Sequence, residues 1–146
     1  MDQWAAVVLA AGHGERMKSR HPKVLHQVCG KVVLRYPVEL LQQLGIDRIL
    51  VVVSPGNNKA VRDLLGGDLD YVIQHQALGT AEALSTAAPG LLGQSEQLLV
   101  LGADSPLVRL DTVRMLMERH TSDSGDMTVL AAQSAAGGDM GRVLRD

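Results

Sequence analysis

Short apolar runs of strand length alternate along this chain with segments whose apolar side chains have helical spacing. The runs occupy residues 4–10, 48–54, 70–74, 97–103 and 127–133. The segments with helical spacing lie between them, at residues 33–45, 57–67, 79–90 and 110–120. Because parallel strands need a crossover between them, usually a helix, this alternation predicts a mostly parallel, doubly wound α/β sheet.

Polar and glycine residues at the ends of these segments support the predicted helices. Asn57 and Thr80 stand where a helix N-cap is expected, and Gly45 stands where the first helix should end. In sheets of this kind, ligands bind beyond the carboxyl ends of the strands. The loop that follows residues 4–10 is therefore the first place to look for a site.

The predicted core is aliphatic. Hydrophobic residues make up 46% of the 146 residues, but phenylalanine is absent and the only aromatic residues are Trp4, Tyr36 and Tyr71. Buried parallel strands are typically built from such Val and Leu runs. The length suits one domain, and we expect residues 1–146 to form it.

The charge balance and the lone cysteine exclude several classes of protein. A net charge of −2 gives no basic face for nucleic acid, and three aromatic residues give no stacking platform for bases. No apolar stretch approaches the roughly 18–20 residues of a membrane span, and the N-terminus lacks the pattern of a signal peptide. Cys29 has no second cysteine to pair with. We expect a cytoplasmic protein with a small-molecule partner, no nucleic acid and no membrane.

The loop from Leu9 to His26 is rich in glycine and in basic residues. A dinucleotide loop, a nucleoside-triphosphate loop and a basic surface turn are the candidates. The dinucleotide pattern GxGxxG lacks its third glycine, because Met17 stands there, and the phosphate-loop pattern GxxxxGK[ST] is missing. Gly12 and Gly14 allow positive φ and a close approach of backbone amides to an anion. The loop therefore favours a triphosphate, with a solvated surface turn as the alternative.

Two stretches of this loop, LAAGHGERM (9–17) and PKVLH (22–26), resemble the signature of the sugar-1-phosphate nucleotidyltransferase family, and within it of the uridylyltransferases. Further similar segments follow in the same order. Gln74 with Gly79 and Thr80 resembles the segment that reads the base, DSPL (104–107) resembles a metal-binding segment, and GRVLRD (141–146) resembles a turn beside the sugar. Glu15 and Ala103 depart from the family, which usually has Thr and Gly there.

The resemblance implies a Rossmann-like fold of the nucleotide-diphospho-sugar transferase type and a reaction that joins UTP to N-acetylglucosamine-1-phosphate with Mg²⁺. It implies catalytic roles for Arg16 and Lys23, a metal ligand in Asp104, and sugar contacts at Ala103 and Gly141. It assigns nucleotide binding to Leu9, Ala10, Ala11, Gly12, Gly14, Lys23, Gln74, Gly79 and Thr80. Arginine and lysine suit this chemistry because they neutralise phosphate oxygens.

Members of this family usually continue with a sugar-site portion, and often with an acetyltransferase β-helix domain. We expect this chain to be the truncated, nucleotide-binding portion, without those parts. Two other functions stay open: transfer with another nucleotide or acceptor, and nucleotide binding without catalysis. An uncovered sheet edge would also favour a homo-oligomer.

Overall fold

The computed structural model describes residues 4–12, 14, 17–19, 21–123, 125–133 and 143. It divides the chain into two compact units, Met1–Leu110 and Asp111–Asp146. The single domain expected from the sequence stays a prediction. The two units are therefore described one at a time.

A four-stranded parallel sheet forms the centre of the first unit. Its strands are β1 (Trp4–Leu9), β4 (Arg48–Val53), β5 (Asp70–Ile73) and β6 (Gln97–Gly102), in the order β5-β4-β1-β6. In the middle of the sheet, Val7 lies between Leu50 of β4 and Val100 of β6. Four of the five predicted strands and their parallel arrangement are thus confirmed.

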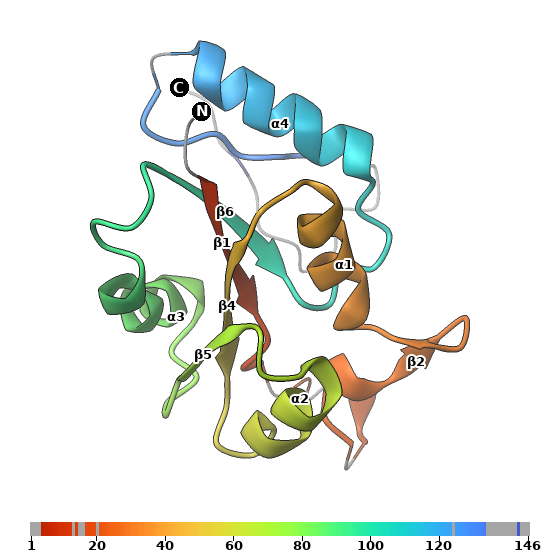
Figure 1. The fold of residues 1–146 in the computed structure, drawn as a ribbon. Helices are drawn as coiled ribbons and strands as arrows, with labels where there is room; N and C mark the ends of the chain where they lie inside the picture. Colours follow the sequence, from red (N-terminus) through yellow and green to blue (C-terminus); the bar gives the residue numbers. More distant parts are fainter. Residues whose placement is uncertain are drawn as a thin grey trace. The chain divides into compact units, whose positions relative to one another are not determined.

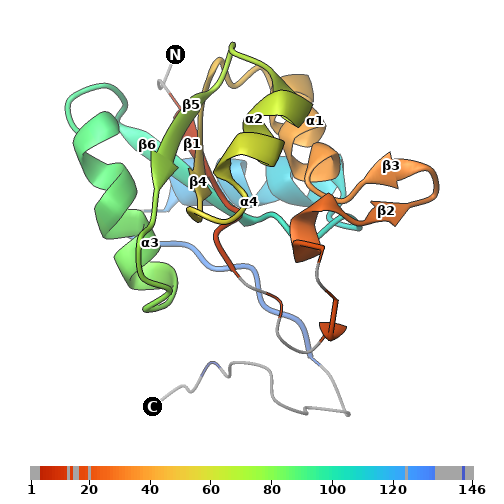
Figure 2. The ribbon, with the colours of Figure 1, turned by 90° about the horizontal axis from the view of Figure 1, so that it is seen from below.

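Helices cover both faces of this sheet. Helices α1 (Arg35–Gln43) and α2 (Asn58–Leu65) lie on one face, and α3 (Thr80–Ala87) lies on the other (Figures 1 and 2). The chain passes from β1 to β4 and β5, and then returns to place β6 on the other side of β1. The predicted doubly wound fold is confirmed. Its order reverses between β1 and β6, and ligands bind at such a reversal.

The helix ends differ in detail from the prediction. Asn57 is the N-cap residue of α2 as expected, but its side chain makes no cap hydrogen bond. The N-cap of α3 is Gly79 rather than Thr80, and its φ of 107° explains why a glycine stands there. Helix α1 ends at Gln43, and Gly45 follows with a φ of 74°. The predicted stop at Gly45 is confirmed to within two residues.

A short hairpin that the sequence did not predict precedes α1. It consists of β2 (Gln27–Val28) and β3 (Lys31–Val32), which pair antiparallel. Strand β2 follows the 3₁₀ helix η2 (Lys23–Leu25). The Tyr36 hydroxyl of α1 donates a hydrogen bond of 2.6 Å to the carbonyl of Val28. This bond ties the hairpin to the body of the unit.

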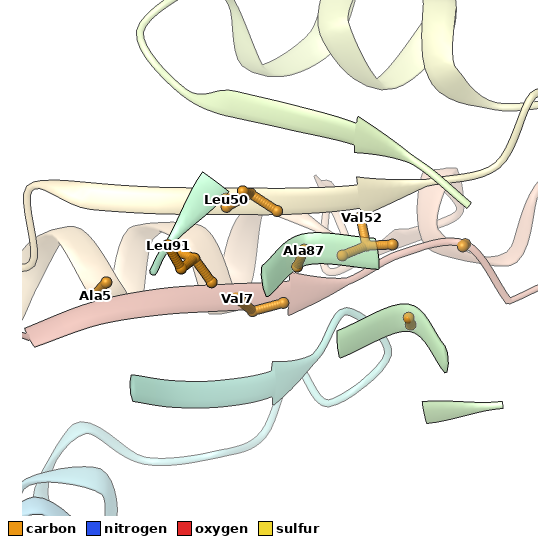
Figure 3. Packing of buried hydrophobic residues seen from close by; sticks show 8 residues of the cluster. Ala5, Val7, Leu50, Val52, Ala87 and Leu91 are labelled. Atoms are coloured by element: carbon orange, nitrogen blue, oxygen red, sulfur yellow. The ribbon is translucent and has the colours of Figure 1, made fainter. Parts of the chain in front are cut away.

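An aliphatic cluster packs the sheet against α3 and the 3₁₀ helix η3 (Ala88–Gly90) that follows it. Because strand residues alternate between faces, Ala5 and Val7 of β1 point toward α3, whereas Ala6 and Val8 point to the opposite face. All four are fully buried, so both faces are covered. Figure 3 labels the cluster residues Ala5, Val7, Leu50, Val52, Ala87 and Leu91. The expected core of small aliphatic side chains is confirmed.

Helix α4 (Leu110–Ser122) belongs to the second unit from its second residue onward, and it confirms the predicted helix at 110–120. The predicted strand at 127–133 is wrong, because these residues form no regular structure and pair with no other described segment. A strand needs hydrogen bonds to a neighbour. Met127 and Val129 are instead exposed. None of the helices that the structure describes, α4 included, is long and apolar enough to cross a membrane.

Candidate functional site

A cavity of about 580 Å³ opens at the carboxyl ends of the parallel strands. It lies where β1 leads into the glycine-rich loop and where β6 ends at Gly102. Strand β4 contributes Val52 to its wall, and α3 contributes Thr80 and Ala83. The cavity therefore lies where ligands bind in doubly wound folds.

The cavity brings together most of the residues that the sequence singles out. Those that line it are Leu9, Ala11, Gly12, Gly14, Lys23, Gln74, Gly79, Thr80 and Asp104. Ala10 and Ala103 are fully buried, and their amides donate to the carbonyls of Val52 and Leu9. Their roles in nucleotide and sugar binding stay predictions. Arg16 and Gly141 lie outside the described residues.

Lys23 and Asp104 form an ion pair at this cavity. The Lys23 Nζ lies 2.5 Å from the Asp104 Oδ2, although the two residues are 81 positions apart. Both side chains are partly exposed, at 33% and 45%. The hydrogen bond from Lys23 lowers the pKa of the Asp104 carboxyl. Asp104 is therefore ionised at neutral pH, and the described residues that line the cavity carry one charge of each sign.

Gly14 gives Lys23 the room that this position requires. Its φ is 63°, and a Cβ at this residue would lie 2.6 Å from the Cβ of Lys23. Gly12 is different, because its φ is not positive and a Cβ there would meet nothing within 4 Å. Of the two glycines that allow a positive φ, Gly14 adopts one and Gly12 does not.

Asn57 holds the start of the glycine-rich loop, a role that the sequence did not predict. Its Nδ2 donates to the carbonyl of Ala10 over 2.8 Å, and its Oδ1 accepts from the amide of Ser54 over 2.9 Å. Only 3% of Asn57 is exposed. The side chain therefore joins the turn after β4 to the loop after β1. Its position before a helical segment indicated only a cap.

Gln74 enters the cavity wall with a partner that the sequence did not indicate. Its amide N–H continues the sheet by donating to the carbonyl of Val53 over 2.8 Å. Its side-chain Nε2 donates to the Glu82 Oε2 and, over 3.4 Å, to the carbonyl of Gly79. Glu82 belongs to α3 and is half-buried. No sequence pattern distinguished it from an ordinary helix residue.

The donor groups of the cavity fit a magnesium ion that arrives with a nucleotide. Asp104 is the one carboxylate among the described residues that line the cavity. The described part of the chain contains no group of three or more His, Cys, Asp or Glu residues that could hold a metal ion. Mg²⁺ is usually held by one or two carboxylates together with phosphate oxygens and water. A single carboxylate meets that requirement when a ligand supplies the phosphate oxygens.

Comparison with known proteins agrees with this site. The MobA-like NTP transferase domain matches residues 6–139. The chain is 39% identical over 146 residues to the bifunctional protein GlmU of Caldanaerobacter subterraneus subsp. tengcongensis. The match covers the whole of this chain but only 32% of that relative. The chain thus spans about a third of the length of this relative.

Solved structures share the fold. The Rv0371c protein of Mycobacterium tuberculosis H37Rv is 25% identical, with a TM-score of 0.71 over 83% of this chain and 62% of that one. The inositol-1-phosphate CTP transferase of T. maritima is 28% identical, with a TM-score of 0.59 over 70% of this chain and 44% of that one. The cavity, the glycine-rich loop after β1 and the match over residues 6–139 lead to one conclusion: the chain belongs to the MobA-like NTP transferase domain family.

Proposed function

We propose that this chain transfers a uridylyl group from UTP to the phosphate of N-acetylglucosamine-1-phosphate and releases pyrophosphate. The observation that carries the proposal is the cavity beyond β1, where Gly14, Lys23, Gln74 and Asp104 line one space. That space offers backbone amides and a cation for phosphates, an amide side chain for a base, and a carboxylate for a metal ion. Each of these groups matches one part of a nucleotide bound with its magnesium.

The reaction needs positioning and charge neutralisation more than a base. An oxygen of the sugar phosphate attacks the α-phosphorus of UTP and forms a new P–O bond. The bond between the α-phosphorus and the bridging oxygen breaks, and pyrophosphate leaves with its electron pair. A phosphate monoester has a second pKa near 6, so at neutral pH the attacking group is already mostly ionised. The barrier therefore lies in bringing anions together.

Lys23 supplies positive charge where the phosphates meet. Its Nζ lies at the cavity wall, 2.5 Å from Asp104, and is partly exposed. When a nucleotide is bound, the ammonium group would turn to the α-phosphate, and Arg16 would stabilise the departing β- and γ-phosphates. Asp104 would hold Mg²⁺, which, when bound, neutralises phosphate charge. Gly14 leaves the space that Lys23 occupies, because it has no side chain.

The nucleotide and the sugar follow from the resemblance and from the relatives. Gln74 and Gly79 line the cavity together, at the place where the base-reading segment would lie. The similarity to GlmU over the whole chain supports N-acetylglucosamine-1-phosphate as the acceptor. Because the CTP transferase of T. maritima shares the fold, the base must be tested rather than assumed.

The test measures pyrophosphate release by the chain from UTP, N-acetylglucosamine-1-phosphate and Mg²⁺. The Lys23→Ala variant is compared with Lys59→Ala, which removes the same charge from an exposed position on α2. We expect Lys23→Ala to lower the rate on the order of a hundredfold, because a charge that stabilises the transition state is lost. Lys59→Ala should leave the rate unchanged.

Two results would contradict the proposal. In the first, calorimetry shows that the chain binds UTP, but neither the chain nor any variant releases pyrophosphate. The chain would then be a nucleotide-binding module without transfer. Equal rates in Lys23→Ala and in the unchanged chain would remove Lys23 from the reaction. Chelation of Mg²⁺ with EDTA should abolish release and serves as a further control.

A further inference from the structure

We propose that Glu82 acts as a positioning residue that fixes the side-chain amide of Gln74, so that the cavity accepts pyrimidines with an N–H at position 3 and rejects cytosine. This inference rests on the proposed function, because it concerns the base of the nucleotide held in the same cavity. It adds a specificity-determining residue that lies outside the cavity lining. Its starting point is the pair formed by Gln74 and Glu82.

The chemistry of the neighbours fixes which end of the Gln74 amide faces which way. An ionised carboxylate and a backbone carbonyl are both acceptors only. Glu82 Oε2 and the carbonyl of Gly79 both lie beside one end of the Gln74 amide. That end must therefore be the NH₂ group, because a carbonyl oxygen there would face two acceptors. The Oε1 of Gln74 then remains at the other end as an acceptor.

Glu82 is itself held in place. The Thr86 hydroxyl, one helical turn further along α3, lies 3.0 Å from the other Glu82 oxygen, Oε1. It lies the same distance from the Glu82 backbone carbonyl, so these two acceptors compete for its single proton. Oε1 thus lies beside this hydroxyl on the helix, and Oε2 is the oxygen that accepts from Gln74. Gln74 is 5% exposed, and its backbone is fixed to β4, so the amide has little freedom to turn.

The fixed amide matches uracil better than cytosine. Uracil presents the N3–H donor beside the O4 acceptor, whereas cytosine presents the N3 acceptor beside an N4 donor. The Gln74 Oε1 can accept a hydrogen bond from the N3–H of uracil, but it faces another acceptor in the N3 of cytosine. The first backbone amides of α3, which begins at the cavity residues Gly79 and Thr80, have no partner within the helix and suit O4. Both contacts therefore favour the N3–H and O4 edge of uracil.

The test compares the affinities of UTP and CTP, with Mg²⁺, by isothermal titration calorimetry. We expect the chain to prefer UTP by tenfold or more, the usual size of a correctly paired two-point base contact. Glu82→Gln keeps the shape but lets residue 82 either donate or accept, so that the Gln74 amide can turn over. The preference should then fall to within about threefold. Ser85→Ala, an exposed change on the same helix, is the matched control and should keep the full preference.

A double-mutant cycle separates positioning from a general effect on the fold. In a Gln74→Ala background, Glu82→Gln should no longer change the ratio of UTP to CTP affinity, because Glu82 acts only through Gln74. A UTP preference that survives in Glu82→Gln overturns this inference and leaves the proposed function standing. Failure of the unchanged chain to bind UTP at all overturns both. Thermal unfolding of each variant verifies that it is folded.

Discussion

The absence of a side chain at Gly14 leaves the space that Lys23 occupies. Any side chain at this position meets two obstacles, a φ of 63° and the Cβ of Lys23 at 2.6 Å. Lys23 in turn forms the ion pair with Asp104. The glycine thus contributes to the charge arrangement of the cavity through space, without making a polar contact of its own. Its role goes beyond the close approach of backbone to phosphate that its position in the loop suggests.

We expect Gly14→Ala to weaken UTP binding at least tenfold, because the added methyl group displaces Lys23. The left-handed backbone should also cost about 1 kcal/mol of unfolding free energy. Calorimetry measures the first effect, and urea unfolding followed by circular dichroism measures the second.

Gly30→Ala separates the two effects. Gly30 has a φ of 77°, but a Cβ there would meet nothing within 4 Å. This variant should lose a similar unfolding free energy and keep its affinity for UTP. Equal affinities in Gly14→Ala and in the unchanged chain would show that Lys23 does not depend on the space beside it.

At the scale of the elements, the glycine-rich loop after β1 is attached to the turn between β4 and α2. Asn57 makes the attachment with both ends of its side-chain amide, one to Ala10 and one to Ser54. All three residues are buried, so water cannot replace either hydrogen bond without a rearrangement. The loop therefore begins from a fixed point, although its sequence is rich in glycine.

Asn57→Ala should lower the unfolding free energy by about 2–3 kcal/mol, because it leaves a buried carbonyl and a buried amide without partners. Asn58→Ala is the matched control. Asn58 follows directly in the chain, and its side chain accepts only an exposed hydrogen bond from Arg62. It should cost no more than about 0.5 kcal/mol. Similar losses in both variants, measured by urea unfolding, would contradict the role given to Asn57.

The sequence was sufficient for elements with a strong periodicity and insufficient where contacts are distant. The Val-rich runs of β1 and β4 predicted strands correctly, because such runs are buried on both faces of a parallel sheet. Residues 127–133 are also mostly apolar, but they pair with no strand in the part of the chain that the structure describes, and periodicity alone does not reveal a partner. The hairpin of β2 and β3 was missed because two-residue strands are too short to show alternation.

The candidate site shows the same limit. The motif placed Lys23 and Asp104 among the site residues separately, but their ion pair depends on a contact across 81 positions. The partnership of Gln74 with Glu82, and the attachment of Ala10 by Asn57, had no signal in the sequence. In each case a side chain that does not line the cavity forms a hydrogen bond to a predicted site residue. Sequence motifs report the groups that touch the ligand better than those that support them.

At the scale of the whole molecule, the first unit is stabilised by many small contacts, since the chain contains no phenylalanine. The cluster between the sheet and α3 consists of Ala, Val and Leu side chains (Figure 3). Small side chains let α3 approach the sheet closely, and they cannot rearrange to fill a cavity left by a substitution. The removal of even two methyl groups in the middle of this layer should therefore lower the unfolding free energy.

Val7→Ala should lower the unfolding free energy by about 1.5–3 kcal/mol, from the lost burial of two methyl groups and the cavity that remains. Val7 is fully buried on the central strand β1. Val129→Ala makes the same chemical change at a residue that is 59% exposed, and it should cost less than about 0.5 kcal/mol. Urea unfolding of both variants checks the difference, and equal losses would contradict the packing described here.

Strand β1 also separates the tryptophan of the chain from the cavity. Its first residue is Trp4, the one tryptophan of the chain, and its last is Leu9 at the cavity. Five steps of about 3.3 Å place the two roughly 17 Å apart along the strand. A nucleotide in the cavity is too distant to quench the indole by contact. Indole fluorescence should therefore stay constant through a UTP titration and change only when β1 unfolds. The chain thus carries an internal reporter of folding that is insensitive to its ligand.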